Sequence, residues 1–159
     1  MYNLEIITSK QEQYRREITD PVVEQWLRNP DNCCDIILRQ INQDRMYDPI
    51  FAGRDNMTVV DFGANIGLFS LYARDSASRL VAVEPMANTF DVLTRLTDSH
   101  YNIERVQAAM ANTDGPVTFY QNENSTVNSL LDRNGTALTV PGMTFAGLDR
   151  KSTRLNSSH

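Results

Sequence analysis

The chain has 159 residues, of which 41% are hydrophobic and 22% charged, and its formal net charge at pH 7 is -5. This length suits about one domain with a sizeable core, and the composition is that of a globular rather than a disordered protein. The negative charge disfavours a nucleic-acid backbone or an anionic membrane as the main partner. No apolar run approaches the roughly 20 residues of a membrane helix, and the N-terminus lacks the apolar centre of a signal peptide.

The two cysteines of the chain, Cys33 and Cys34, are neighbours. Adjacent cysteines make a poor disulfide, and two are too few for a Cys-rich metal cluster. We therefore expect no metal site and interpret the pair as small hydrophobic residues in a helix. A reducing cytoplasm is the predicted compartment.

Residues 1–56 are predicted to form a polar, mainly helical lead-in, in which "NLEII" is a candidate edge strand. In "DPVVEQWLRN", Asp20 is the expected helix cap and Pro21 the first helical residue. The apolar stripe of this helix consists of Val22, Val23, Trp26 and Leu27. In "DNCCDIILRQINQDRMY", Asp31 is the candidate cap, and the residues expected to point inward are Ile36, Ile37 and Ile41.

From Met57 onward, strands alternate with helices. "TVVDF" predicts a strand that ends at Phe62, followed by a helix from about Asn65 to Ser76. "RLVAVEP" predicts a second strand, "ANTFDVLTRLTDS" a helix with Phe90, Leu93 and Leu96 on one face, and "NIERVQAAM" a third strand. This alternation indicates an α/β fold with a parallel sheet. In "GPVTFYQN" and "ALTVPGMTFAGL" the residues alternate in the manner of antiparallel strands, which predicts an antiparallel β-hairpin near residues 116–146.

A glycine-rich turn, "GANIG", joins the first of these strands to its helix. Glycines let the backbone approach a ligand closely, and the start of a helix offers unpaired N–H groups. In open parallel sheets, ligands bind at the carboxyl ends of the strands, where this turn lies. Glu84 ends the second strand and can accept hydrogen bonds from the hydroxyls of a ribose. The pattern predicts a cofactor that contains a nucleoside, held by Gly63 to Gly67 and by Glu84.

The position of Asp61 favours one cofactor over another. A dinucleotide-binding turn has the spacing G-x-G-x-x-G, whereas here an acid stands two residues before Gly63 and no third glycine follows Gly67. An acid beside the turn repels a pyrophosphate but can bind an ammonium group. S-adenosylmethionine, whose methionyl end carries an ammonium, is therefore favoured over a nicotinamide dinucleotide. The alternative structural interpretation is that Asp61 only caps the turn and the glycines only permit tight packing.

Three segments, "VVDFGANIGLFSLYA", "LVAVEPMANTFDVLTRL" and "NIERVQAAMANTDGPVTFYQNEN", resemble in order and spacing the FkbM-type S-adenosylmethionine-dependent methyltransferases. The resemblance extends from about residue 57 to 148. It implies the class I methyltransferase fold, with a Rossmann-like parallel sheet flanked by helices, and O-methylation of a small molecule or sugar. It also implies that Glu84 holds the ribose. The residues that it places around the methionine moiety are Asp61, Gly63, Ala64, Asn65 and Gly67, and those that flank the adenine are Pro85 and Ala108.

The resemblance assigns no general base, and the remaining polar and aromatic candidates are interpreted from their positions in the sequence. His100 is predicted to be a surface histidine away from the cofactor loop. Tyr47 and Phe51 are predicted to pack in the core, with contact to cofactor or substrate as the alternative. Ser125 and Asn128 are candidates to face the substrate, with turn and capping roles as the alternative.

The final segment, "DRKSTRLNSSH", has no apolar periodicity and resembles one translated frame of a sequencing adapter. We therefore expect residues 149–159 to be non-native and to pack against nothing. The family continues past "TFAGL" with a strand carrying a D-x-E-G-like segment that is absent here, so the sheet is expected to be incomplete. The predicted units are a lead-in (1–56), the first part of the methyltransferase domain (57–148) and the tail. Such a fragment is expected to be inactive by itself.

Two other functions stay open from the sequence. One is a non-catalytic module that binds a nucleoside or a protein partner, and the other is a nicotinamide-dependent oxidoreductase. Asp61 argues against the oxidoreductase, because the turn would have to tolerate a pyrophosphate. The sequence does not indicate an oligomeric state.

Overall fold

The computed structural model of the protein describes residues 1–122, 130–131 and 135–156. Ser125 and Asn128, the two candidates for substrate contact in the polar loop, lie outside these described residues. Within the described part, no helix has both the length and the apolar character needed to cross a bilayer.

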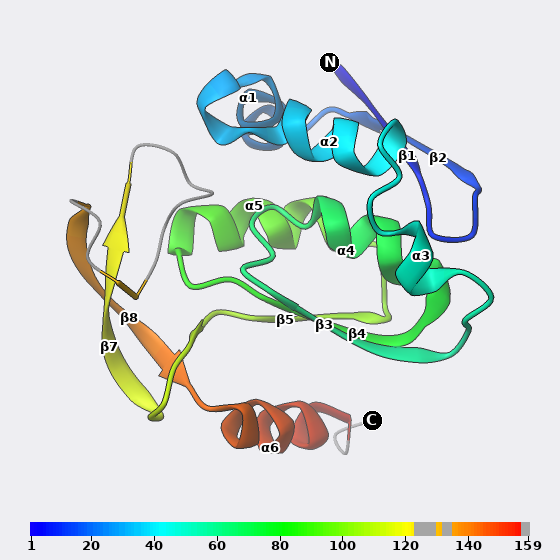
Figure 1. Cartoon of the computed structure of the whole chain (residues 1–159). Coiled ribbons are helices and arrows are strands. Elements are labelled where there is room, and N and C mark those ends of the chain that lie inside the picture. Colours follow the sequence, from blue (N-terminus) through cyan, green and yellow to red (C-terminus); the bar gives the residue numbers. More distant parts are fainter. Residues whose placement is uncertain (123–129, 132–134, 157–159) are drawn as a thin grey trace.

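A parallel sheet of β3 (Met57–Phe62), β4 (Ala77–Val83) and β5 (Ile103–Val106) forms the centre of the molecule, in the order β3-β4-β5. The first connection runs through α4 (Leu68–Ala73) and the short η2 (Arg74–Ser76), and the second through α5 (Ala87–Thr97). Helices α4 and α5 lie on one face of the sheet, and α6 (Phe145–Asn156) lies on the other (Figure 1). The predicted α/β class, with a Rossmann-like parallel sheet flanked by helices, is confirmed.

The alternation of side chains along the strands divides the core between the two faces of the sheet. Leu80 and Ala82 of β4 belong to the cluster that includes α4 and α5, whereas Val81 and Val83 belong to a smaller cluster. Leu148 of α6, 3% exposed, packs in this smaller cluster. Because successive residues of a strand point to opposite faces, one apolar strand at the centre of the sheet supports helices on both sides.

The N-terminal segment is an integral part of the main core. It contains an antiparallel hairpin of β1 (Tyr2–Ile7) and β2 (Gln13–Ile18), the helices α1 (Pro21–Arg28) and α2 (Cys34–Asn42), and the short η1 (Pro30–Asn32) and α3 (Asp48–Phe51). Leu4 and Ile6 of the hairpin are fully buried in the cluster that contains Leu71 and Tyr72. Helix α1 packs on α5 and α2 on α4, which adds a further layer to that face of the sheet (Figure 1).

Hydrogen bonds also fasten the hairpin to the ends of the central helices. The backbone N–H of Ser9 donates to the carbonyl of Tyr72 at 2.9 Å, and the Arg16 guanidinium donates to the carbonyl of Leu96 at 2.6 Å. These carbonyls belong to the last turns of α4 and α5, where a helix has unpaired acceptors and a cation interacts favourably with its dipole. The hairpin therefore satisfies the helix ends that it covers.

Two helix predictions in the N-terminal segment are partly wrong. Asp20 caps α1 as expected, since its Oδ1 accepts from the N–H of Val22 at 2.9 Å, but Val22 itself is 41% exposed. The N-cap position of α2 is Cys33, in the left-handed region with φ 55°, rather than the expected Asp31. Ile36 is 52% exposed rather than inward, while Ile41, about 140° away around the helix at 3.6 residues per turn, is fully buried.

A second sheet beside the first contains β6 (Ala109–Met110), β7 (Gly115–Gln121) and β8 (Thr136–Met143), in the order β6-β8-β7. The pairing of β7 with β8 is antiparallel, so the predicted hairpin is confirmed. The short β6 adds a parallel strand along β8, which the sequence pattern did not indicate.

The last helix differs from the expected unstructured tail. Helix α6 begins at Phe145 and continues to Asn156, past the expected boundary after Leu148. The guanidinium of Arg150 also donates to Asp114 Oδ2 at 3.1 Å, so the expectation that this segment contacts nothing is wrong at that residue. The non-native origin of residues 149–159 stays a prediction.

Candidate cofactor site

The glycine-rich turn is a five-residue loop between Phe62, the end of β3, and Leu68, the start of α4. The N–H groups of Gly63 and Ala64 both donate to the carbonyl of Val83, at 2.9 and 3.0 Å. This tie holds the loop against the carboxyl end of β4. The predicted helix start near Asn65 or Ile66 is wrong, because Asn65 (φ 51°) and Gly67 (φ 90°) both have left-handed backbone that an α-helix excludes.

The two glycines of the loop have different surroundings. A Cβ at Gly67 would lie 2.6 Å from Leu93 Cδ1 and 3.1 Å from Thr97 Cγ2, so a glycine there permits close packing against α5. A Cβ at Gly63 would have no atom within 4 Å. Gly63 therefore borders open space, whereas Gly67 lies behind the loop against the core.

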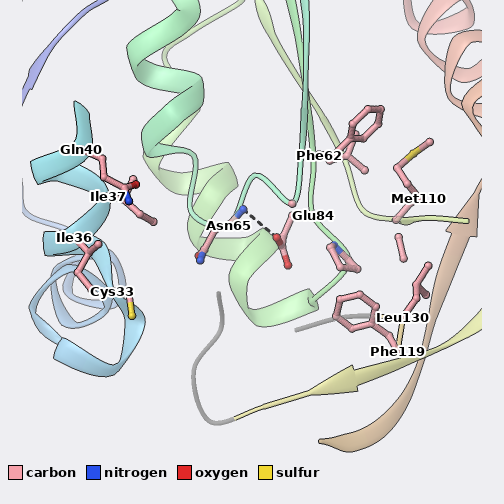
Figure 2. Close-up of a pocket in the computed structure, with 15 residues that line it drawn as sticks. Cys33, Ile36, Ile37, Gln40, Phe62, Asn65, Glu84, Met110, Phe119 and Leu130 are labelled. Carbon is pink, nitrogen blue, oxygen red and sulfur yellow. Dashed lines mark hydrogen bonds between the residues drawn. The ribbon is translucent and has the colours of Figure 1, made fainter. Parts of the chain in front are cut away.

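Glu84 lies directly after β4 and is only 6% exposed. Its Oε2 accepts from the N–H of Asn65 at 3.0 Å (Figure 2). Its Oε1 accepts from the N–H of Met86, also at 3.0 Å. Burial raises the pKa of Glu84, and these two backbone hydrogen bonds oppose that rise. Each carboxylate oxygen has a second lone pair, so the fixed carboxylate can accept further hydrogen bonds from a ligand.

Asp61 is next to last in β3, on the strand adjacent to the one that leads to Glu84. Its Oδ2 accepts from Ser70 Oγ at 2.7 Å. Burial raises the pKa of Asp61 to about 6, against the opposing effect of the Ser70 hydrogen bond. At neutral pH the group is therefore mainly a carboxylate, in surroundings that solvate its charge poorly.

Two adjoining cavities open on either side of the loop. The larger, about 630 Å³, has Glu84 in its wall and is called the Glu84 cavity. The smaller, about 350 Å³, has Asp61 in its wall and is called the Asp61 cavity. They share a boundary of four residues, Ile37, Phe62, Gly63 and Asn65. Both volumes lie within or near the range of known ligand pockets.

The structure brings most of the predicted site residues to these cavities. Pro85 and Ala108 line the Glu84 cavity, and Ala64 lines the Asp61 cavity. Gly63 and Asn65 border both. Gly67 lines neither cavity, because it lies behind the loop and packs against α5.

The sequence analysis did not identify the wall that faces the loop. Helix α2 contributes Ile36, Ile37 and Gln40 to the Glu84 cavity, its N-cap residue Cys33 lies beside them, and β7 contributes Phe119 (Figure 2). The exposed Ile36 is explained by this position, since its side chain faces the cavity instead of the core. The sequence signal for this wall was Ile36, an apolar residue that lies on a different side of α2 from Ile41. The signal was ambiguous, because Ile36, Ile37 and Ile41 together also fit a helix face that packs in the core.

Of the other candidates, Tyr47 and Phe51 have different positions. Tyr47 lines the Asp61 cavity together with Phe69, whereas Phe51 is 3% exposed and packs in the core as predicted. His100 follows α5 and is half-buried, with its Nε2 3.5 Å from Tyr14 Oη. Among the described residues, no cluster of three or more histidine, cysteine, aspartate or glutamate side chains has the arrangement of a metal site.

Comparison with known proteins gives a methyltransferase relative. The methyltransferase sdnD of Sordaria araneosa is 36% identical over 93 residues, which cover 54% of this chain and 36% of the relative. The chain thus spans about a third of the length of that curated relative. A solved structure, phosphoethanolamine N-methyltransferase 1 of Haemonchus contortus with phosphoethanolamine and S-adenosylhomocysteine, matches 54% of this chain and 20% of its own, with 16% identity and a TM-score of 0.40.

No family model matches the chain. The parallel sheet with helices on both faces, taken with the relative in sequence, fits the Rossmann-like class I methyltransferase fold that the sequence predicts.

Proposed function

We propose that the protein is an S-adenosylmethionine-dependent methyltransferase of the FkbM type. The observation that carries the proposal is the pair of carboxylates at the ends of adjacent parallel strands, Asp61 and Glu84, with a glycine loop between two joined cavities. A ligand with a ribose at one end and an ammonium at the other matches this arrangement. The similarity to sdnD supports the same class of activity.

The Glu84 cavity is proposed to hold the adenosine half of the cofactor. Glu84 would accept hydrogen bonds from the two ribose hydroxyls on the lone pairs that Asn65 and Met86 leave unused. Pro85 and Ala108 would flank the adenine, because both line the cavity with small, apolar surface beside that carboxylate. The backbone hydrogen bonds from Asn65 and Met86 orient the Glu84 carboxylate before the ligand arrives. Less conformational entropy is then lost when the ligand binds.

The Asp61 cavity is proposed to hold the methionyl half. Asp61 offers a negative charge where a cofactor pyrophosphate would be repelled, which disfavours a nicotinamide dinucleotide. Gly63 and Asn65 lie at the boundary of the two cavities, where the centre of the cofactor would lie. The absence of a Cβ at Gly63 leaves room there.

S-adenosylmethionine supplies an activated methyl group on its sulfonium when bound. Methyl transfer then depends mainly on placing the acceptor atom in line with that group. The residues of this chain would fix the cofactor, and Ile36 and Ile37 of α2 would contribute apolar surface to the wall of the Glu84 cavity. We propose O-methylation of a small molecule or sugar, on the FkbM resemblance, and a cytoplasmic location, supported by two neighbouring cysteines that form no disulfide.

Isothermal titration calorimetry with S-adenosylmethionine, S-adenosylhomocysteine, adenosine and NAD tests this proposal. The expected result is binding of the first two and none of NAD. Binding of NAD alone would favour the oxidoreductase. Binding of adenosine and S-adenosylhomocysteine with equal affinity would indicate a nucleoside-binding module without a methionyl site, and binding of none would remove the proposal.

A further inference from the structure

The Asp61 cavity combines two aromatic rings with a single charged group. Tyr47 and Phe69 contribute the rings, and among the described residues that line the cavity Asp61 is the one that carries a formal charge. The remaining lining residues are aliphatic apart from Gly63, Asn65 and Phe62, and the ring of Phe62 lies against Phe145 of α6. Cations bind to the faces of aromatic rings as well as to carboxylates. The composition of the wall therefore fits a cationic ligand group.

The position of Tyr47 in this wall is fixed by the residues around it. Its ring lies 4.9 Å from that of Phe69 and 5.9 Å from that of Tyr72, between ring centroids. The next residue, Asp48, accepts hydrogen bonds from Tyr72 Oη at 2.9 Å and from Arg45 Nε at 2.8 Å. These contacts fasten the start of α3 to α4, so the ring of Tyr47 is held in the wall before a ligand binds.

The carboxylate of Asp61 makes a neutral occupant unfavourable. Its described partner is the hydroxyl of Ser70, and a buried carboxylate with one neutral donor is poorly compensated. An apolar group in the cavity would exclude the remaining water and leave the charge less solvated. An ammonium group would instead pair with the carboxylate and lie against the rings.

We propose that Tyr47 and Phe69 form, with Asp61, an aromatic and acidic pocket for the primary ammonium of the ligand. This inference rests on the proposed function, and it assigns a cofactor-binding role to a residue of the N-terminal segment. The segment 1–56 is then part of the cofactor site rather than a lead-in to it.

The test compares three ligands that differ in their cationic groups. S-adenosylmethionine carries an ammonium and a sulfonium, S-adenosylhomocysteine the ammonium alone, and 5′-methylthioadenosine neither. Calorimetry is performed on the wild type and on Tyr47→Leu, which keeps an apolar side chain but removes the ring. We expect Tyr47→Leu to weaken S-adenosylhomocysteine binding about 3- to 10-fold, the scale of a partly desolvated cation–π contact, and to leave 5′-methylthioadenosine binding unchanged.

Two further variants serve as controls. Tyr47→Phe keeps the ring and should bind all three ligands as the wild type does. Phe51→Leu changes a ring that touches Phe69 and Tyr72 but is buried in the core. It should lower the thermal unfolding midpoint without changing the preference for S-adenosylhomocysteine over 5′-methylthioadenosine.

The possible results separate the inference from the function on which it rests. Equal weakening of all three ligands by Tyr47→Leu would show that the ring only packs, and selective weakening of S-adenosylmethionine would assign it to the sulfonium. Either result overturns the ammonium assignment and leaves the methyltransferase proposal intact. A wild type that binds none of the three ligands would overturn both.

Discussion

The backbone N–H of Asn65 donates to Glu84 Oε2 at 3.0 Å, so the carboxylate proposed to receive the ribose also holds the glycine loop in place. The loop and the end of the neighbouring strand therefore share one anchor. Any change at Glu84 acts both on the shape of the loop and on ligand affinity.

Replacement of Glu84 by alanine should weaken S-adenosylhomocysteine binding by about 1–3 kcal/mol, the scale for losing hydrogen bonds to a charged group. It should also lower the free energy of unfolding, because the N–H groups of Asn65 and Met86 lose their acceptor. Glu84→Gln retains one acceptor oxygen and should have an intermediate effect on both. Calorimetry and urea unfolding measure the two quantities, and an unchanged affinity in Glu84→Ala would reject the ribose role.

The ionisation of Asp61 should make the unliganded protein less stable as the pH rises. Its folded pKa is about 6, above the ordinary value of 3.8, so the folded state binds more protons between those values. The contribution of Asp61 to stability is thus greatest below about pH 4 and is lost as the pH rises through about 6. Relative to wild type, Asp61→Asn should gain stability across this window and reach a plateau of about 1–3 kcal/mol by pH 7. Urea unfolding from pH 4.5 to 8 measures the difference, and a difference that does not vary with pH would contradict the assignment.

The same substitution should have the opposite effect on ligand binding. Asp61→Asn removes the charge that is proposed to meet the ammonium, so S-adenosylhomocysteine affinity should fall by about 1–3 kcal/mol. Binding of 5′-methylthioadenosine should not change. A stabilised variant with normal S-adenosylhomocysteine affinity, measured by calorimetry at pH 7.5, would show that Asp61 only caps the turn.

The two loop glycines should respond differently to alanine. At Gly67 the new Cβ would meet Leu93, a fully buried side chain, and the backbone has φ 90°. We expect Gly67→Ala to lower the free energy of unfolding by about 2–4 kcal/mol. At Gly63 there is backbone strain with φ 72° but no neighbouring atom, so the loss should be about 1–2 kcal/mol. Gly63→Ala should instead reduce ligand affinity, since its methyl group would enter the space where the Glu84 and Asp61 cavities meet. If Gly63→Ala lowered the free energy of unfolding more than Gly67→Ala does, the described packing of Gly67 would be contradicted.

The docking of α6 can be tested at Leu148. Its side chain is buried in the cluster with Val81 and Val83, and Leu148→Ala should destabilise the protein by about 2–4 kcal/mol. Phe145, at the start of the same helix, is 66% exposed, and Phe145→Ala serves as the matched control with a loss below about 1 kcal/mol. Thermal unfolding distinguishes them, and equal midpoints for the two variants would indicate that α6 does not pack as described.

The features that could be predicted from the sequence are those with strong local signals. The apolar strands that end at Phe62 and Val83, each next to an acid, define the sheet and the place of Asp61 and Glu84 without further information. The Asp20 cap with Pro21 is equally local. In these cases the chemistry of a few neighbouring residues decides the structure.

The features that could not be predicted depend on contacts between distant segments. Strand β2 has a polar sequence and a single buried residue, Ile18, so its composition does not indicate a strand. Its pairing with β1 is what makes it one. The Tyr47 wall depends on Asp48 reaching Tyr72 across the fold. The late start of α4 depends on backbone conformation at Asn65 and Gly67, which asparagine and glycine permit but do not require.

The attachment of the N-terminal hairpin to the ends of α4 and α5 has a consequence for how the protein is made. The hairpin leaves the ribosome before the helices that it covers, yet Arg16 reaches a carbonyl 80 residues later in the chain. Contacts of such sequence separation slow folding, because a long loop must close before they form. Until α4 has been synthesised, the apolar side chains of Leu4 and Ile6 lack part of the cluster that buries them, because β1 packs against both α2 and α4. The nascent chain would therefore carry an exposed two-stranded ribbon through much of its synthesis, which makes this hairpin a site where chaperone binding or misassembly would begin.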